Sequence, residues 1–274
     1  MDKIPTVRIA WLLRWEPALV VAACTLGFAV IPLMLGQIGL SWDALNHHIY
    51  LGWVADQARF DRDYLAASYQ SYQYPYLYWP VYRLAASGAD GVTAGVALAL
   101  LHVLAVPAVW LLAKTCIPGQ GWFELAMRSL AVAMAFISGL VLSLFDSTSN
   151  DLLAATPMIW AMAIALAPFS AQQPAWLASG RAACLSGALG GVAIACKLSN
   201  VPLFVLLPLF WGLCRGTLTR RARLIFFGLA GSAAGFLVAY GDWGWQLWQH
   251  FGNPLYPFLD GWFAPLRAWT GWAE

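Results

Sequence analysis

The sequence predicts an all-α integral membrane protein with about seven transmembrane helices and a large first outer loop that contains interfacial amphipathic helices. Of its 274 residues, 61% are hydrophobic and only 10% are charged. A soluble domain has roughly 45–50% apolar and about 25% charged residues. The mean hydropathy of +0.66 agrees with a membrane protein. This composition excludes a water-soluble globule and an intrinsically disordered chain.

The charge and cysteine content exclude two further classes. The net charge is +2, which gives no basic surface for nucleic acid. The five cysteines follow no metal or redox spacing, so we expect free thiols and no disulfide framework.

Apolar stretches long enough for a membrane helix set the predicted topology. About 20 apolar residues cross a ~30 Å hydrocarbon core. The first stretch is too long for a cleavable signal and lacks a small-residue cleavage site. The predicted spans cover residues 17–38, 92–113, 129–145, 152–169, 182–210 and 224–240.

The stretch 182–210 decides the number of spans, because Lys197 to Pro202 interrupts it. Two short helices that turn near Ser199 would give seven spans, whereas one long span would bury the lysine. Lys and Arg accumulate in cytoplasmic loops. Seven spans place ten of them inside and four outside, with Lys197 at the break. The charges therefore favour seven spans and a cytoplasmic N-terminus.

This topology divides the chain into three parts. Residues 1–16 form a cytoplasmic segment, residues 17–240 form the transmembrane module with the outer loop 39–91, and residues 241–274 form an aromatic tail on the outer face. Ten of the thirteen acidic residues lie on that outer face. We therefore expect any chemistry there.

The outer loop has a helical period over residues 44–60, with Leu45, Ile49 and Trp53 on one stripe. This pattern predicts a helix that lies flat in the membrane interface. Eight of the ten tyrosines follow between Tyr50 and Tyr82. An aromatic belt at headgroup depth explains them, and a sugar-stacking surface is the less favoured interpretation.

Asp43 lies where the first span ends and the loop helix begins. It is either a helix cap, because Asp accepts hydrogen bonds from free amides, or a general base at the rim of a cavity. His47 is on the same helical face, and His48 follows it. The spacing Asp43-x3-His47-His48 also suits metal ligands, although no third ligand is evident. We assign no metal or cofactor, and a divalent ion stays open.

Asp151 and Lys197 are two further charged residues at the ends of spans. Asp151 either caps the fourth span or faces the same cavity as Asp43. Lys197 either pairs with Asp151 or binds a phosphate oxygen. An enzyme should bring Asp43, Asp151 and Lys197 into one outward-facing cavity.

The tail has the order Gly252-Asn253-Pro254-Leu255-Tyr256-Pro257-Phe258, which contains a turn. Its tryptophans fit an interfacial anchor. The order of residues around Asn253 is more specific than anchoring requires.

Four short motifs resemble the GT-C superfamily of polytopic membrane glycosyltransferases, which use lipid-phosphate-linked sugars. The motifs are Trp42-Asp43-Ala44-Leu45-Asn46-His47-His48-Ile49, Ser149-Asn150-Asp151-Leu152, the glycine-rich stretch 190–200 that ends in Lys197-Leu198-Ser199-Asn200, and residues 252–258. The motifs are short, but the resemblance extends over most of the chain and is to uncharacterised bacterial members. The resemblance implies a shared seven-span module whose first outer loop carries an acidic catalytic residue.

The resemblance also implies a reaction. A polyprenyl-phosphate sugar would bind with its phosphate beside Lys197, His250 or Arg267. Asp43 would deprotonate the hydroxyl of a glycan, lipid or protein acceptor, with inversion at the sugar. Asp151 would position the acceptor, a metal ion or Lys197, and His47, His48 and Asn253 would contact substrate. The implied location is the bacterial inner membrane, with the active face outside the cytoplasm.

Two other functions stay open: a transporter of lipid or a small solute, and a non-catalytic subunit of a polysaccharide assembly machine. Broken helices with polar residues also occur in transporters. Family members usually carry further spans after the shared module, so this chain is a fragment, a minimal form, or one half of an assembly with a partner that supplies more helices.

Overall fold

The computed structural model describes residues 6–170 and 175–272, and most of them are helical. The bundle helices are α1 (Thr6–Leu35), α4 (Gly91–Leu101), α5 (Val106–Cys116), α6 (Trp122–Phe136), α7 (Gly139–Leu144), α8 (Asp151–Leu166), α9 (Gly180–Cys196), α10 (Val201–Phe204), α11 (Leu206–Leu213) and α12 (Leu218–Phe251). The other named elements are the π-helical turn η1 (Ala44–His48), α2 (Ile49–Val54), the extended segment β1 (Ala66–Tyr69), α3 (Trp79–Ala86) and α13 (Asp260–Thr270), and short 3-10 turns lie between several of them.

Four helical stretches within the described residues are long and apolar enough to cross a membrane. They are Trp11–Leu35, Gly91–Cys116, Asp151–Phe169 and Leu218–Phe251. Two shorter apolar stretches, Gly180–Cys196 and Leu198–Leu213, lie between the last two. The all-α class is therefore confirmed, and these helices indicate a multi-pass membrane protein.

Several predicted spans differ from the helices in detail. Residues 91–116 contain a 3-10 turn at His102–Ala105, because Pro107 has no amide hydrogen for a regular helical bond. The stretch 129–145 is two helices, and Ser138 caps the second by accepting from the amide of Val141. The last helix continues past residue 240 to Phe251, where Gly252 ends it in the left-handed region.

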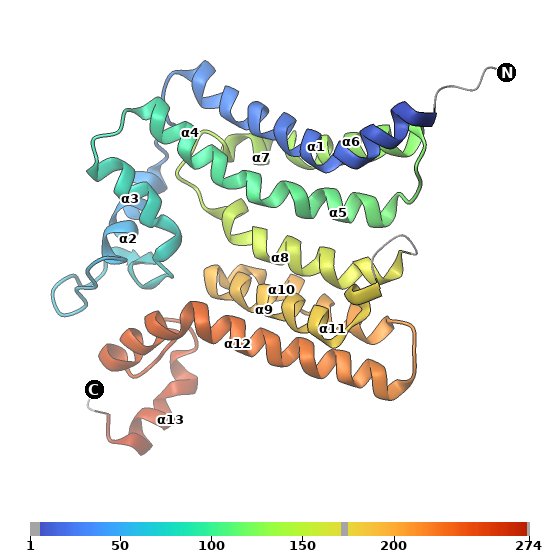
Figure 1. The fold of residues 1–274 in the computed structure, drawn as a ribbon. Helices are drawn as coiled ribbons and strands as arrows, with labels where there is room; N and C mark the ends of the chain where they lie inside the picture. Colours follow the sequence, from blue (N-terminus) through green and yellow to red (C-terminus); the bar gives the residue numbers. More distant parts are fainter. Residues whose placement is uncertain (1–5, 171–174, 273–274) are drawn as a thin grey trace.

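The predicted break after residue 196 is present, and the chain reverses there. Helix α9 ends at Cys196, Lys197 is extended, and Pro202 lies in the first turn of α10. Figure 1 shows α10 and α11 returning alongside α9. The hairpin interpretation of residues 182–210 is thus confirmed.

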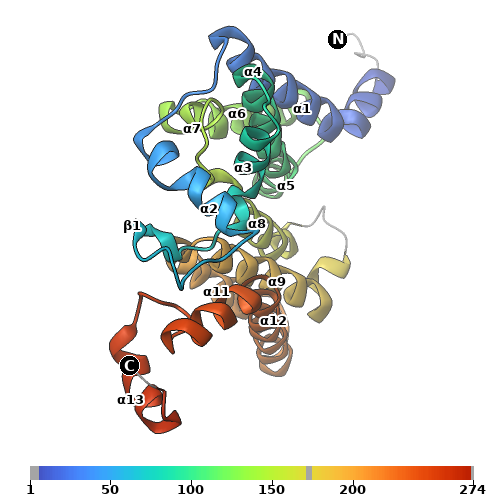
Figure 2. The same cartoon turned by 90° about the vertical axis from the view of Figure 1, so that its left-hand side faces the viewer.

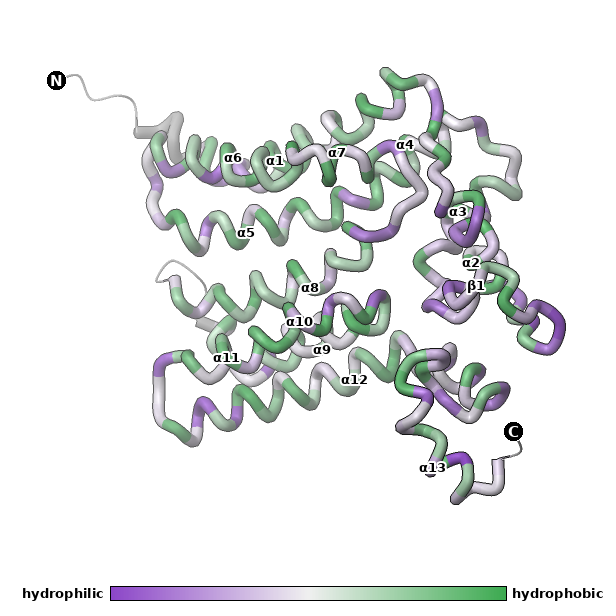
Figure 3. Tube along the Cα trace, turned by 180° about the vertical axis from the view of Figure 1, so that it is seen from behind, coloured by the Kyte–Doolittle hydropathy of each residue, from purple (hydrophilic) through white to green (hydrophobic). Residues whose placement is uncertain are grey.

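The bundle has two ends of different character. The outer loop with α2 and α3 lies at the left-hand end in Figure 1, as does α13, whereas α1, α6, α9 and α12 all begin at the opposite end. Viewed from that left-hand end, the loop lies across the bundle between α1 and α12 (Figure 2). Hydrophilic residues gather in the loops at the two ends of the bundle, and the helices between these loops are mainly hydrophobic (Figure 3).

Glycines allow α9 and α12 to approach each other closely. A Cβ atom at Gly191 would lie 2.1 Å from the carbonyl oxygen of Ser232, and one at Gly231 would lie 2.1 Å from that of Cys184. Gly187 and Gly235 have similar contacts. Both helices thus carry a Gly-x3-Gly pair, the small-residue pattern that brings membrane helices together. This contact fixes the position of the α9 end, where Lys197 follows.

A buried ion pair that the sequence analysis did not predict lies at the opposite end of the bundle. Arg128 on α6 donates to both carboxylate oxygens of Glu16 on α1, at 2.6 and 2.8 Å. It also donates to the carbonyls of Ile117 and Gly119. Both side chains are buried, and these bonds offset the cost of removing the charges from water.

We expect Gly191→Ala to destabilise the bundle, because its new methyl group would overlap the backbone of α12. Overpacking of this kind costs about 1–3 kcal/mol, so the melting temperature of the purified protein should fall. Gly241→Ala on α12 is the matched control, since a Cβ there meets nothing within 4 Å. Equal melting temperatures for the two variants would contradict close packing of α9 on α12.

Candidate functional site

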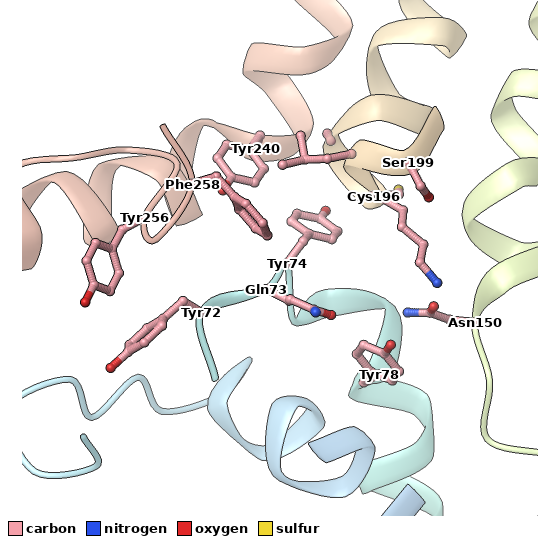
Figure 4. Close-up of a pocket in the computed structure, with 13 residues that line it drawn as sticks. Tyr72, Gln73, Tyr74, Tyr78, Asn150, Cys196, Ser199, Tyr240, Tyr256 and Phe258 are labelled. Atoms are coloured by element: carbon pink, nitrogen blue, oxygen red, sulfur yellow. The ribbon is translucent and has the colours of Figure 1, made fainter. Parts of the chain in front are cut away.

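Two neighbouring cavities lie between the outer loop and the bundle. The first, the carboxylate cavity, has a volume of about 560 Å³, and its wall includes Asp43, Asp146 and Asp151. The second, the aromatic cavity, measures about 200 Å³ (Figure 4). Gln73, Tyr78 and Lys197 line both, so the two cavities share a wall.

Asp43 lies at the start of η1, but its side chain does not cap the helix. Ser41 takes that role, because its hydroxyl accepts from the amide of Ala44 at 3.2 Å. The capping interpretation of Asp43 is therefore wrong. Its carboxylate is half-exposed and lies 3.7 Å from Nδ1 of His47. It can thus accept a proton from a molecule in the carboxylate cavity.

The loop helix differs from its predicted form in length and in helix type. It ends at Val54, not at residue 60, and η1 is a π-helical turn. A π-turn holds more residues than an α-turn and so rotates the following side chains. Leu45 is exposed, while Ala44, His47 and Leu51 are buried. The buried face is thus the one that carries His47, whereas Leu45 on the predicted interface-facing stripe points away from the protein.

His47 and His48 are buried side by side beneath Asp43. Nδ1 of His48 lies 2.7 Å from the hydroxyl of Thr148, and its ring stacks on Tyr78 at 4.6 Å. Burial, together with the neighbouring His47, lowers the pKa of His48 to about 4. Burial also lowers the pKa of His47, against the effect of Asp43. Both rings are therefore neutral at neutral pH.

The turn at residues 146–151 lies beside the outer loop, as its position on the same face predicted. The amide of Gly39 donates to the carbonyl and to Oδ1 of Asp146, at 3.2 and 3.1 Å. Asn150 occupies the cap position of α8 without a side-chain capping bond. Asp151 accepts from the hydroxyl of Ser149 at 2.6 Å. The capping interpretation of this turn is therefore not confirmed, and Asp151 faces the carboxylate cavity.

Lys197 forms an ion pair with Asp151 across the gap between α9 and α8. Asn200 holds this junction, because its buried amide donates to the carbonyls of Ala154 and Ala193 at 3.1 and 2.8 Å. Lys197 keeps 38% of its side chain exposed. The pair therefore fixes the ammonium at the wall between the cavities without enclosing it.

The aromatic cavity is built where the tyrosine-rich part of the loop packs on α12. Tyr74 stacks with Tyr240 at 6.1 Å, and the indole of Trp243 donates to the carbonyl of Tyr72 at 3.1 Å. Tyr76 donates to Asp242 at 2.8 Å. These tyrosines form an internal core with α12, so the aromatic-belt interpretation is wrong for them.

Tyr78 is the central residue that the sequence analysis missed. It is buried, and its side chain is hydrogen-bonded to Asn150 and lies near Asp151 and Asp43. Burial and these carboxylates raise the pKa of its hydroxyl, which therefore stays protonated. It is one of the eight tyrosines of the outer loop, and no sequence pattern distinguished it from the other seven.

Three predicted substrate-binding residues line neither cavity. Nδ1 of His250 lies 2.9 Å from the carbonyl of Gln246. Asn253 is fully buried and donates to the carbonyl of Phe258. Arg267 forms a bidentate pair with Asp260 at 2.8 and 3.0 Å. The His250 contact lies within α12, the Asn253 contact within the turn that follows, and the Arg267 pair within α13.

No metal centre is evident in the part of the chain that the structure describes. Groups of three or more His, Cys, Asp or Glu side chains with suitable geometry are absent from residues 6–170 and 175–272. The pattern Asp43-x3-His47-His48 therefore gains no third ligand there.

Comparison with known proteins finds no match to a family model, to a curated protein or to a solved structure.

The neutral histidines make stability depend on pH. The pKa of His48 is about 4 in the folded protein and 6.5 when unperturbed, so the unfolded chain takes up its proton first as the pH falls. Stability should therefore decrease from about pH 6.5 down to about pH 4 and change little from this group below that. His48→Gln should flatten this part of a plot of melting temperature against pH. An unchanged slope would contradict a buried neutral His48.

Proposed function

We propose that this chain is a membrane glycosyltransferase that moves a sugar from a polyprenyl-phosphate donor to an acceptor hydroxyl on the outer face of a bacterial inner membrane. The observation that carries the proposal is the shared site: Asp43 and the Asp151–Lys197 pair line one cavity at the loop end of the bundle. The resemblance of the surrounding motifs to the GT-C superfamily supports the same reaction.

The proposed topology has seven crossings. The four long apolar helices, the hairpin of α9 with α10 and α11, and the pair α6 and α7 supply them. Arg215 lies between α11 and α12, and three further arginines lie in the first two turns of α12, at the end of the bundle opposite the outer loop. Positive residues accumulate in the cytoplasm, so the N-terminus is cytoplasmic and both cavities open on the other side.

Asp43 is the proposed general base. Its carboxylate is half-exposed, is not used as a helix cap, and has the neutral ring of His47 at 3.7 Å. A carboxylate in this position takes the proton of the acceptor hydroxyl as its oxygen attacks the anomeric carbon. The bond from that carbon to the phosphate oxygen breaks, and its electron pair stays on the phosphate. A single displacement inverts the sugar.

Lys197 is the proposed phosphate ligand. Its ammonium lies at the wall of the aromatic cavity, beside the side chains of Ser199 and Asn150. A fixed cation stabilises the negative charge that develops on the leaving phosphate. Asp151 holds Lys197 in place before the donor binds, and Tyr74 and Tyr240 offer ring faces to the sugar or to the first isoprene units.

We expect Asp43→Asn to reduce transfer by about 10²–10⁴-fold, the usual contribution of a general base. The measurement is the release of polyprenyl phosphate from short-chain polyprenyl-phosphate sugars by protein in nanodiscs, with a bacterial membrane extract as the acceptor source. Asp61→Asn is the matched control, since Asp61 is an exposed loop carboxylate paired with Arg62. Equal release by wild type and Asp43→Asn would overturn the role of Asp43. If neither folded protein releases product but both bind the lipid phosphate, a non-catalytic subunit becomes the favoured function.

We expect Lys197→Gln to weaken donor binding by roughly 10–100-fold, because a hydrogen bond to a charged group contributes about 1.5–3 kcal/mol. Binding of polyprenyl phosphate to protein in nanodiscs measures this directly. Arg62→Gln removes an exposed positive charge from the outer loop and serves as the control. Unchanged binding by Lys197→Gln would place the phosphate elsewhere.

A further inference from the structure

The carboxylate cavity has an unbalanced negative charge. Its wall carries Asp43, Asp146 and Asp151, whereas Lys197 is the one lysine or arginine among the described residues that line it. Lys197 is already paired with Asp151. Burial keeps His47 and His48 neutral at neutral pH. Two carboxylates therefore have no cationic partner in the cavity wall.

A short structural contact holds the Asp146 side chain at this wall. Its Oδ1 accepts from the amide of Gly39 at 3.1 Å, and its backbone carbonyl accepts from the same amide. The side chain thus stays next to the linker between α1 and η1. The proposed reaction gives Asp146 no task, so its charge is available to act on whatever enters the cavity.

The aromatic cavity differs in charge. Its described lining contains Lys197, five tyrosines and the polar groups of Gln73, Asn150 and Ser199, and no carboxylate. Figure 4 shows the tyrosines from the loop and from α12 around this space. An anionic phosphate therefore binds Lys197 from the aromatic cavity. The acceptor then occupies the carboxylate cavity.

We propose that the carboxylate cavity selects its acceptor by charge: it admits hydroxyl compounds without negative charge and favours those that carry an amino group. This inference rests on the proposed function, because it assigns the carboxylate cavity to the acceptor. Amino sugars and neutral sugars fit this class, and uronic acids or phosphorylated glycans do not. A cleft lined by one sign of charge concentrates the opposite sign and repels its own.

The first experiment measures this selection without relying on transfer. A cysteine replaces Ser143, an exposed residue that lines the carboxylate cavity. Its modification by a cationic and by an anionic methanethiosulfonate reagent is followed by peptide mass spectrometry at low salt. Gln249→Cys, exposed on α12 outside both cavities, gives the reference ratio. We expect the cationic preference at position 143 to exceed the reference by about tenfold.

Asp146→Asn is the decisive second variant. Its amide oxygen can still accept from Gly39, while its negative charge is gone. The cationic preference should fall by about threefold in this variant and stay unchanged in Asp61→Asn. No excess preference at position 143, or no change in Asp146→Asn, would overturn the inference.

The second experiment uses acceptors. A protein-free membrane extract is divided on an anion-exchange resin, and each fraction is tested for polyprenyl phosphate release by wild-type protein. We expect release with the unbound neutral and cationic fraction and at least tenfold less with the bound anionic fraction. Release with the anionic fraction overturns the inference and leaves the proposed function intact. If neither fraction supports release, the proposed function fails, and the thiol measurement still decides the charge selectivity of the cavity.

Discussion

A positive charge at the end of an apolar helix must find a counter-charge or reach water, and the pairing of Lys197 with Asp151 meets this need. The pair joins the end of α9 to the start of α8. Hydrogen bonds from the side-chain amide of Asn200 hold the same junction. The turn before α8 then carries Thr148 against His48, which positions the outer loop. The geometry of both cavities thus depends on the break in α9. Glycine packing on α12 places that break at a fixed height in the bundle.

The sequence predicted those features that depend on local hydropathy and charge. Composition indicated a membrane protein, the length of the apolar stretches indicated helices, and Lys197 with Pro202 inside one such stretch predicted the reversal that follows α9. The loop helix was harder to predict, because a helical wheel assumes 3.6 residues per turn and η1 is a π-turn. The face with His47 is therefore buried, whereas Leu45 on the predicted apolar stripe is exposed.

Residue type also predicted roles that tertiary contacts contradict or reassign. By residue type, Asp43 suited a helix cap as well as a general base. The structure shows that Ser41 supplies the cap, because its hydroxyl accepts from the amide of Ala44. Arg267 had the charge of a phosphate ligand, but Asp260 on the same helix pairs with it. Tyr78 could not be distinguished from its neighbours, because its importance comes from the docking of the loop beside α8. Local pattern thus identified the charged site residues, and the contacts between distant segments decided which of them share a cavity.

The central claim is that a lipid phosphate binds at Lys197 from the aromatic side while Asp43 faces the acceptor. A cryo-EM structure of the protein in nanodiscs with bound polyprenyl phosphate tests it most directly. The account predicts phosphate density within hydrogen-bond distance of the Lys197 ammonium, next to Tyr74 and Tyr240, with the carboxylate cavity free of lipid. Phosphate density among the arginines near the start of α12, or beside Asp43, would contradict it.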